Sequence, residues 1–530
     1  MKKSIIIILL CGVVASVFAV PARKGAIVRT TADGTKKIVY LHGDAFSHHM
    51  TDAEGNWLDE KTLEPLNAET KAAREELNIQ RRNARRVYEA EKVGNKPNIA
   101  PRGLLILVNF QDKAFETPYD TIHNMLDGNH FTRNYSYEYE DEYGRSKTEN
   151  VQSEGSARQY FHDQSYGKYN PIFDVVGPYT VSKELAYYGE NDDANIGYLI
   201  KEACELADAD GADFTLYDND NDGKVDFVYV IYAGYGEADG GPEETIWPHN
   251  YDLRYTGQNC KVDGKTIRNY ACSNEISYYS QQYNGIGTFC HEFSHVLGLP
   301  DLYETNPNPK GLHTPMEWDI LDYGPYNNDG NTPPAYSSYE RFYMGWLTPR
   351  ILTTPQAVWL SDLNYGKGDA ILLCEGDQHN LIGYDPNPTV FYMLESRRKR
   401  GWDKHLPGRG LLITKVSYDA SDWMNNRVNN SASKMGVDII EAKPNYTNYA
   451  KSTDAFPYGA KQWVDFNDHD VTEIEYNVSY GVTIFSYRGA YKTAIENVQD
   501  SEVSVQKILR DGEVIILRGD KAYDILGREK

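Results

Sequence analysis

The chain has 530 residues and a mass of 60.2 kDa, more than one ordinary hydrophobic core uses, and this length predicts roughly three or four units. Lys and Arg number 54 against 77 Asp and Glu, which gives a formal net charge of -23. Such a charge repels phosphate backbones and anionic lipid, and it argues against nucleic acid or a membrane surface as the main partner. Hydrophobic residues at 40% exclude wholesale disorder.

Residues 1–19 have the pattern of a secretory signal peptide. Two lysines precede the apolar run Ile5–Leu10, and small residues follow near Ala19. We expect cleavage after Ala19, with Ala22 as the second choice. The apolar stretch is shorter than the roughly 20 residues that span a bilayer, which argues against a membrane anchor. Cys11 raises lipidation as an alternative, but apolar sequence continues beyond it. The sequence therefore predicts export without stable membrane insertion.

The next segment changes from strands to a charged helix. Lys36–Leu41 is typical of a strand, and residues 63–93 have a helical, strongly charged pattern that contains an arginine run. The run is either a solvated helix face or a protease-accessible site. Gly94–Asn98 then breaks the helix with the composition of a linker. We therefore expect an N-terminal segment that is separate from the rest of the chain.

Residues 100–350 combine apolar strand runs with helical stretches, which predicts a mixed unit. The strands are expected at Leu104–Phe110 and Phe227–Ala233, and the helices around 155–163 and 194–208. Beyond these, short strands separated by turn signals predict a β-rich accessory module over 351–490 and a β tail over 491–530. The expected fold class is α+β, with the β-rich module after the mixed unit.

Removal of the signal leaves five cysteines, an odd number for an exported chain. Asp263–Gly264 is a hairpin signal, and a two-residue turn there places Cys260 opposite about residue 267. A bridge from Cys260 to Cys272 is therefore not required. With so few cysteines, the chain is not a disulfide scaffold.

One motif carries the chemistry. Residues 291–301 have the pattern HExxHxxGxxD. On a helix, His291 and His295 share one face, so both imidazoles reach one metal ion. Glu292 lies beside the first ligand, where it accepts a proton from water instead of binding the metal. After a glycine turn, Asp301 offers the third ligand, with Glu304 as the alternative. Three ligands leave the fourth position open, as in catalytic zinc sites.

A second metal signal is acidic. Carboxylates alternate along the loop, and a glycine within it forces a turn, which is how an EF-hand loop begins. The twelfth position is a tyrosine, so the loop is not an EF-hand. The alternatives are a calcium site and an acidic turn between strands. The candidate ligands are Asp218, Asp220, Asp222, Lys224 and Asp226.

The zinc motif is similar to that of the metzincins, with Asp in place of the more usual third His. The surrounding sequence resembles the M6 family of secreted bacterial metalloproteases, the immune inhibitor A-like peptidases. The resemblance extends from about residue 100 to 490 and is carried by residues 156–161, 246–249, 301–303, 334–340, 394–397 and 408–413. It implies a metzincin-like zinc-protease domain over 100–350, with a mixed sheet and an active-site helix, and a propeptide over 20–99.

Two positions depart from the metzincin pattern or extend it. Leu321 stands where metzincins have the methionine of a turn beneath the metal, and its similar volume preserves packing. Tyr323 lies where some metzincins place a tyrosine that steadies the oxyanion. The N-terminal segment has no cysteine to block zinc, so an aspartate is the candidate for that role: Asp44, Asp52 or Asp59.

The predicted function is a secreted zinc metalloendopeptidase, made as a zymogen. One catalytic Zn²⁺ activates a water molecule, Glu292 is the general base, and the substrates are proteins or peptides. The alternatives are an inactive surface adhesin on a protease fold, supported by Leu321, and a peptidase restricted to one substrate. The ending Ala522–Lys530 resembles sorting domains of exported Bacteroidetes proteins, which implies attachment to the cell surface.

Overall fold

The computed structural model describes residues 18–31, 34–85, 101–141, 143, 145–306, 309–464, 469–490, 505–510, 513–518, 521–523 and 528. The predicted signal peptide up to residue 17 and the linker Gly94–Asn98 lie outside the described residues, as does most of Ala522–Lys530. Among the described helices, none has both the length and the apolar character needed to cross a bilayer. The fold is mixed α+β, with several sheets and few helices.

A six-stranded sheet forms the centre of the molecule. Its middle strands pair in parallel and its edge toward β1 is antiparallel. The apolar run of β6 is buried almost throughout because helices cover both faces. In spatial order the strands are β1 (Phe18–Ala19), β12 (His249–Asp252), β15 (Asn269–Asn274), β11 (Val228–Tyr232), β6 (Arg102–Asn109) and β9 (Ile172–Thr180).

Helices pack on both faces of this sheet, and each face has its own hydrophobic cluster. On one face lie α2 (Tyr119–Asp127), α3 (Ala157–Gln164) and α6 (Gly287–Val296). On the other lie α4 (Leu185–Asp193) and α5 (Ile196–Ala209). Smaller elements complete this part: the hairpin β7 (Thr132–Glu140) and β8 (Ser146–Glu154), and the sheet of β10 (Lys224–Val225), β14 (Lys265–Ile267) and β13 (Cys260–Val262).

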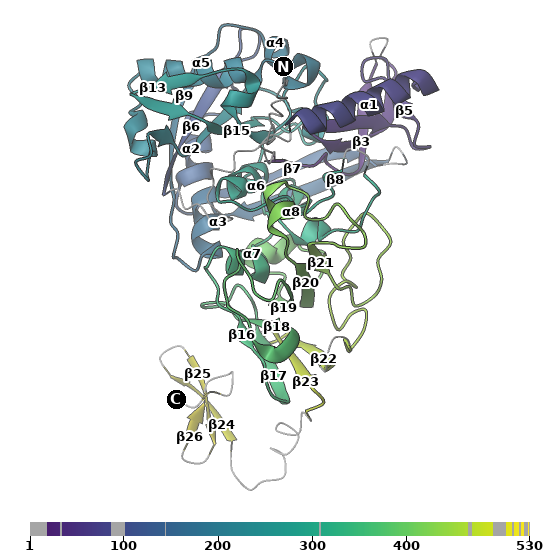
Figure 1. Ribbon diagram of the computed structural model, residues 1–530, viewed down its shortest axis with the longest axis vertical. Coiled ribbons are helices and arrows are strands. Elements are labelled where there is room, and N and C mark those ends of the chain that lie inside the picture. Colours follow the sequence, from purple (N-terminus) through teal and green to yellow (C-terminus); the bar gives the residue numbers. More distant parts are fainter. Residues whose placement is uncertain are drawn as a thin grey trace, which may run out of the picture.

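The N-terminal segment forms a sheet of its own with one helix beside it (Figure 1). Its strands are β2 (Ala26–Thr30), β3 (Lys36–Asp44), β4 (Ser47–Thr51) and β5 (Trp57–Leu58), and α1 (Ala68–Arg85) comes next. Asn78 of α1 donates to the carbonyl oxygen of His48 at 3.0 Å, which ties the helix to β4. A small cluster around Val39 and Met50 forms the core of this sheet.

Two sheets pack against each other in the C-terminal half, at the opposite end of the body from α1 (Figure 1). One contains β16 (Arg350–Ile351), β18 (Ala370–Leu373), β19 (Val390–Arg397), β20 (Gly410–Ser417) and β21 (Val437–Ile439); the other contains β17 (Gln356–Ser361), β23 (Val482–Tyr487) and β22 (Val471–Asn477). Helices α7 (Ser338–Tyr343) and α8 (Ala420–Met424) lie beside them. The tail forms β24 (Val505–Arg510), β25 (Glu513–Arg518) and β26 (Lys521–Tyr523).

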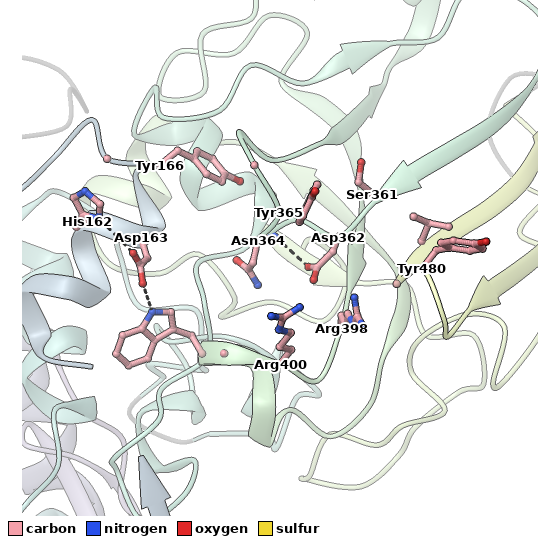
Figure 2. A pocket seen from close by; sticks show the side chains of 16 residues that line it. His162, Asp163, Tyr166, Ser361, Asp362, Asn364, Tyr365, Arg398, Arg400 and Tyr480 are labelled. Carbon is pink, nitrogen blue, oxygen red and sulfur yellow. Dashed lines mark hydrogen bonds and ion pairs between the residues drawn. The ribbon is translucent and has the colours of Figure 1, made fainter. Parts of the chain in front are cut away.

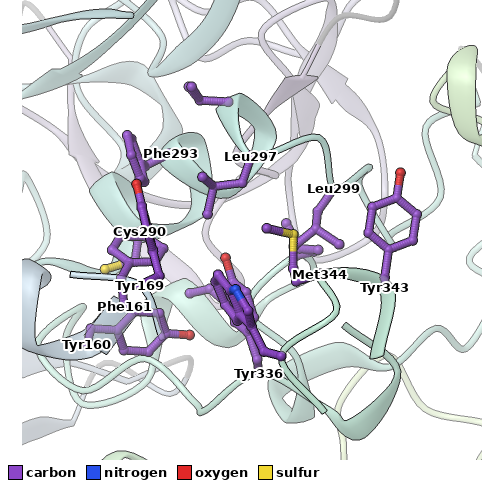
Figure 3. Packing of buried hydrophobic residues seen from close by; sticks show 14 of the residues in the cluster. Tyr160, Phe161, Tyr169, Cys290, Phe293, Leu297, Leu299, Tyr336, Tyr343 and Met344 are labelled. Carbon is purple, nitrogen blue, oxygen red and sulfur yellow. The ribbon is translucent and has the colours of Figure 1, made fainter. Parts of the chain in front are cut away.

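The hydrophobic core runs without a break from the zinc-motif helix into the β-rich part. One cluster contains Phe293 of α6, Tyr336, Leu372 of β18 and Met393 of β19. Figure 3 shows how aromatic side chains from α3 and α6 meet those near α7 within this cluster. The five-stranded sheet therefore packs one face against the cluster that contains α6 and the other face against the three-stranded sheet.

Most elements predicted from apolar runs are confirmed within a few residues; the helix predicted over 63–93 is described as Ala68–Arg85, and residues 86–93 lie outside the described residues. The predicted strands correspond to β3, β6 and β11, and the predicted helices to α1, α3 and α5. The hairpin register is also as predicted, with Cys260 opposite Ile267. Cys260 and Cys272 are both free thiols, and Cys260 instead lies in hydrogen-bond contact with Cys204.

A pocket of about 620 Å³ lies where α3 meets the β-rich part (Figure 2). The indole N–H of Trp402 donates to the carboxylate of Asp163 at 2.9 Å, which joins the two sides. The pocket contains none of the residues of the zinc motif. We therefore look for the functional site at helix α6.

A buried charge network joins β19 to the segment before α7. Arg397 donates to Glu395 at 2.9 Å and to Asp403 at 2.6 and 2.7 Å, and all three side chains are at most 1% exposed. The same guanidinium donates to the carbonyl oxygen of Ala335 at 3.1 Å. The charges compensate one another, so removal of a single partner leaves buried charges unpaired.

We expect Arg397→Ala to destabilise the protein by about 3–5 kcal/mol, because two buried carboxylates lose their cation. Urea unfolding followed by tryptophan fluorescence measures the change. Arg400→Ala is the matched control, because Arg400 is exposed in the same region and its loss changes stability by less than about 0.5 kcal/mol. Equal midpoints for the two variants contradict the prediction.

Candidate metal centre

Helix α6 carries the HExxH motif, and all but one of its residues are buried. It begins at Gly287, where a side chain would collide with the carbonyl oxygen of Pro325. It ends before Gly298, whose φ of 98° lies in the left-handed region that favours glycine. This turn brings Asp301 back beside the helix.

Three side chains converge beside α6. The Nε2 atoms of His291 and His295 lie 3.0 Å apart, and each lies 3.2 Å from Oδ1 of Asp301. All three side chains are buried. One donor atom from each residue lies within 4.8 Å of the others, so a single cation is within reach of all three.

Main-chain carbonyl groups fix both imidazoles. Nδ1 of His291 lies 2.7 Å from the carbonyl oxygen of Ile320, and Nδ1 of His295 lies 2.8 Å from that of Leu299. Each Nδ1 therefore carries the hydrogen, and each Nε2 presents a lone pair to the centre. Two lone pairs and a carboxylate oxygen repel one another at this distance unless a cation lies among them, so these residues fit a metal ion.

Asp301 is held by a residue far along the chain. The side-chain oxygen of Asn426 accepts from the backbone N–H of Asp301 at 2.8 Å, and its amide nitrogen donates to Oδ2 at 2.6 Å. Oδ1 of Asp301 is buried without a hydrogen-bond partner, and it faces the two histidines. Burial by itself would raise the pKa of Asp301, but His295 and His291 outweigh it and lower that pKa to about 2.

Glu292 lies beside this cluster with one oxygen free. Oε1 accepts from the backbone N–H of Val20 at 3.0 Å, and Oε2 is buried without a hydrogen-bond partner. Burial raises the pKa of Glu292 to about 8, and Asp301 adds to the rise, while His291 and the Val20 N–H oppose it. A carboxyl group in such surroundings is suited to take up and return a proton near neutral pH.

Residues 19–24, which come before the N-terminal sheet, lie across the site. Ala19 pairs with His249 in an antiparallel register on the edge strand β12. Ala19 and Val20 are fully buried, and Ala22 is 2% exposed. Nothing in the sequence motifs indicated that these residues reach Glu292, because main-chain pairing at a sheet edge leaves no side-chain signature.

Side chains from later in the chain donate hydrogen bonds to the main chain of this segment. The hydroxyl of Tyr303 donates to the carbonyl oxygen of Ala19 at 2.6 Å, the indole N–H of Trp247 to that of Val20 at 3.0 Å, and the hydroxyl of Tyr326 to that of Pro21 at 2.6 Å. The donors belong to three separate loops. The sequence did not indicate a role for Tyr326, and it marked Trp247 only as part of a segment that carries the family resemblance.

Two basic side chains of the same segment make further contacts. The guanidinium of Arg23 forms an ion pair with Asp329 at 2.8 Å and lies 3.9 Å from the ring centroid of Tyr279. Nζ of Lys24 lies 3.5 Å from the ring centroid of Tyr323. The part of the segment from Ala19 to Lys24 therefore covers the metal centre and is held from both sides.

Three further residues singled out in the sequence lie outside the His–Asp group. Tyr323 lines a cavity of about 510 Å³ with Tyr303 and Met316, and burial raises its pKa. Leu321 is buried in the same cluster as α6, and its carbonyl oxygen accepts from the backbone N–H of Leu302 at 2.8 Å. The carboxylate of Glu304 accepts backbone N–H groups of its own loop at 2.8 and 3.1 Å, and it is not a member of the group.

None of the three aspartates considered for the blocking role lies at the histidines. The Asp44 carboxylate accepts from the backbone N–H of Phe46, and those of Asp52 and Asp59 accept from neighbouring turn residues. That expectation was wrong, because these aspartates serve the turns of the N-terminal sheet. The backbone of Val20 reaches Glu292 instead.

The acidic loop brings Asp218, Asp220 and Asp222 together, with donor atoms within 4.8 Å of one another. Nζ of Lys265 lies 2.5 Å from Asp218, and Asp226 accepts from Asn219. Lys224 forms an ion pair with Asp222 at 2.9 Å. The loop thus has acidic oxygens in one place, and calcium binding there stays a prediction.

A helix that presents two histidines and a glutamate, with a returning aspartate, defines a metal-dependent hydrolase site. Residues 90–347 match the family model described as the immune inhibitor A peptidase M6 catalytic domain. Residues 90–347 are therefore similar to the catalytic domain of the M6 peptidases, as the resemblance implied.

Two kinds of curated relative match part of the chain. The pre-pro-metalloprotease PrtV of Vibrio cholerae serotype O1 is 31% identical over 219 residues, which covers 36% of this chain and 23% of that protein. Immune inhibitor A of Bacillus thuringiensis subsp. alesti is 28% identical over 218 residues, with 34% and 30% covered. The alignments thus span less than a third of either relative.

We expect Asn426→Gly to weaken zinc binding by about 10–100-fold, because the amide that orients Asp301 is lost. Glycine is chosen because Asn426 has a φ of 49°, where other side chains add strain. Competition with a zinc chelator measures the affinity. The control is Asn425→Ala. The side-chain amide of Asn425 donates only to Ser421 of its own helix, so the affinity is retained when it is removed. Unchanged affinity in Asn426→Gly contradicts the assigned role.

Proposed function

We propose that the protein is a secreted zinc-dependent endopeptidase made as a zymogen. The observation that carries this proposal is the convergence of His291, His295 and Asp301 beside Glu292 on a buried helix. The M6 domain and the metalloprotease named among the relatives support it. The substrates are proteins or peptides.

The residues divide the chemistry among them. Zinc held by His291, His295 and Asp301 would polarise a water molecule and the scissile carbonyl group. Glu292 accepts the proton of the water through its free oxygen and passes it to the leaving nitrogen. Tyr323 remains the proposed donor to the developing oxyanion. Leu321 packs under the histidines in the place of a methionine.

The N-terminal segment indicates how a substrate lies in the cleft. Phe18 and Ala19 pair antiparallel with β12, and side chains bind the carbonyl oxygens of the residues that follow. An extended peptide that adds to a sheet edge gains main-chain hydrogen bonds regardless of its sequence. We infer that a substrate takes the same path, and that Trp247 and Tyr326 then bind its main chain.

This overlap supports latency. Trp247 and Tyr326 bind the carbonyl oxygens of Val20 and Pro21, so substrate and residues 20–24 compete for the same donors and the enzyme stays inactive until the segment leaves. The predicted signal cleavage after Ala19 makes Val20 the first residue of the exported chain. Its nitrogen then lies beside Glu292, where it blocks the proton acceptor.

Further parts of the proposal rest on the sequence. Calcium is proposed at the loop of Asp218, Asp220 and Asp222, supported by the gathering of their carboxylates. Export is inferred from the signal pattern, and surface attachment from the C-terminal ending. The inactive adhesin is disfavoured because Leu321 is fully buried, as a methionine there would be, and the residues that the chemistry needs are all present.

We expect Glu292→Ala to reduce casein hydrolysis by the processed protein by about 10²–10⁴-fold, because the proton acceptor is lost. Zinc content stays unchanged, since Glu292 is not a proposed ligand. Glu304→Gln is the control and retains activity, because Glu304 bonds only its own loop. Wild-type activity in zinc-loaded Glu292→Ala overturns the mechanism.

We expect Arg23→Glu to raise the activity of the unprocessed chain several-fold. A carboxylate in place of Arg23 repels Asp329 and loosens the segment over the cleft. Initial rates on a quenched peptide, measured before any cleavage of the N-terminal segment, test this. Lys36→Glu makes the same charge change at an exposed position and leaves latency intact. Equal rates for both variants contradict the blocking role.

A further inference from the structure

A second cluster of metal-binding side chains lies between the N-terminal sheet and the catalytic part. His48 belongs to β4, Glu60 comes after β5, and Glu237 begins a short 3-10 helix (Glu237–Asp239) after β11. One donor atom from each lies within 4.8 Å of the other two. His48 and Glu237 are less than 9% exposed. The cluster therefore joins two parts of the chain at a buried point.

His48 is oriented as a ligand would be. Its Nδ1 lies 3.2 Å from the carbonyl oxygen of Asp44, and its ring stacks on Trp247 with centroids 4.8 Å apart. The hydrogen therefore lies on Nδ1, and the Nε2 lone pair points into the cluster.

The distances inside the cluster are too long for hydrogen bonds. Nε2 of His48 lies 3.8 Å from Oε2 of Glu237 and 3.7 Å from Oδ1 of Asp192. Two ligands that each lie about 2.0–2.2 Å from one ion are separated by such a gap when the ion lies between them. The spacing fits a shared cation better than direct contact.

Glu237 supplies a second, independent observation. Its side chain is 8% exposed, and among the described residues no donor forms a hydrogen bond with its carboxylate. Other carboxylates lie around it, those of Asp193, Glu60, Asp192 and Glu243. A cation beside this carboxylate would offset both its burial and the neighbouring negative charges.

Two arginines pair with carboxylates at the cluster, one of them with Glu60 itself. Arg74 forms an ion pair with Glu60 at 2.6 Å, and Arg81 forms one with Asp192. Neither of these two ion pairs involves Glu237. A cavity of about 660 Å³ lined by Glu60 and Glu243 opens beside the cluster, which gives an ion a way in.

We propose that His48, Glu60 and Glu237 bind a second divalent ion of the zinc class, distinct from the ion of the HExxH helix. One imidazole and two carboxylates suit zinc better than calcium, which takes oxygen ligands alone. The ion cross-links the N-terminal sheet to the catalytic part, because two of its ligands come from the first and one from the second.

The test counts zinc in the full chain. Glu292→Ala is the background, so that self-cleavage does not remove the N-terminal sheet. After dialysis with Zn²⁺ and removal of loose metal, mass spectrometry of the metal should find about two ions per chain. Glu237→Gln and Glu60→Gln should each lower the count to about one. Glu243→Gln, which removes a nearby charge but no ligand, should keep both.

The two sites are separated by a further variant. His295→Ala should remove the ion of the HExxH helix and leave that of His48. Circular dichroism confirms that each variant is folded. A background count of about one, or an unchanged count in both Glu237→Gln and Glu60→Gln, overturns the proposal. The count does not depend on catalysis, so loss of the proposed protease activity leaves the test intact.

Discussion

The hold of Asn426 on Asp301 is the contact on which the rest of the site depends. The two histidines are positioned by one helix, but the third donor comes after a turn and has no regular structure to fix it. A single amide engages both the N–H and the carboxylate of Asp301. The hydroxyl of Thr305 donates to the carbonyl oxygen of Asn426 at 2.5 Å, so the returning loop is fastened at a second point.

The N-terminal segment occupies the path that we propose for a substrate. Its main chain is recognised by donors from separate loops, and its charges by Asp329 and Tyr323. The proposed cross-link at His48 lies on the sheet that comes directly after this segment. The proposed blocking segment and the proposed cross-link thus belong to one continuous stretch of the chain.

Local patterns in the sequence predicted the local parts of the structure. The apolar runs predicted β6 and β11, the turn signal predicted the register of Cys260, and the HExxH spacing predicted which side chains share a face of α6. The sequence did not predict contacts between distant segments. Asn426 reaches the site through its side-chain amide and Val20 through its main-chain N–H, and neither residue type is distinctive in sequence. The aspartates Asp44, Asp52 and Asp59 had the right chemistry for zinc, but turns of the N-terminal sheet use them.

The shared hydrophobic cluster makes the usual division into modules misleading. The family match ends at residue 347, yet the helix with the histidines packs in one core with β18 and β19, and Asn426 comes from the loop after α8. A protein cut at that boundary exposes the underside of its own catalytic helix to water. Transplanting the M6 part onto another partner, or trimming the chain for crystallisation, must therefore carry the β-rich part along with it.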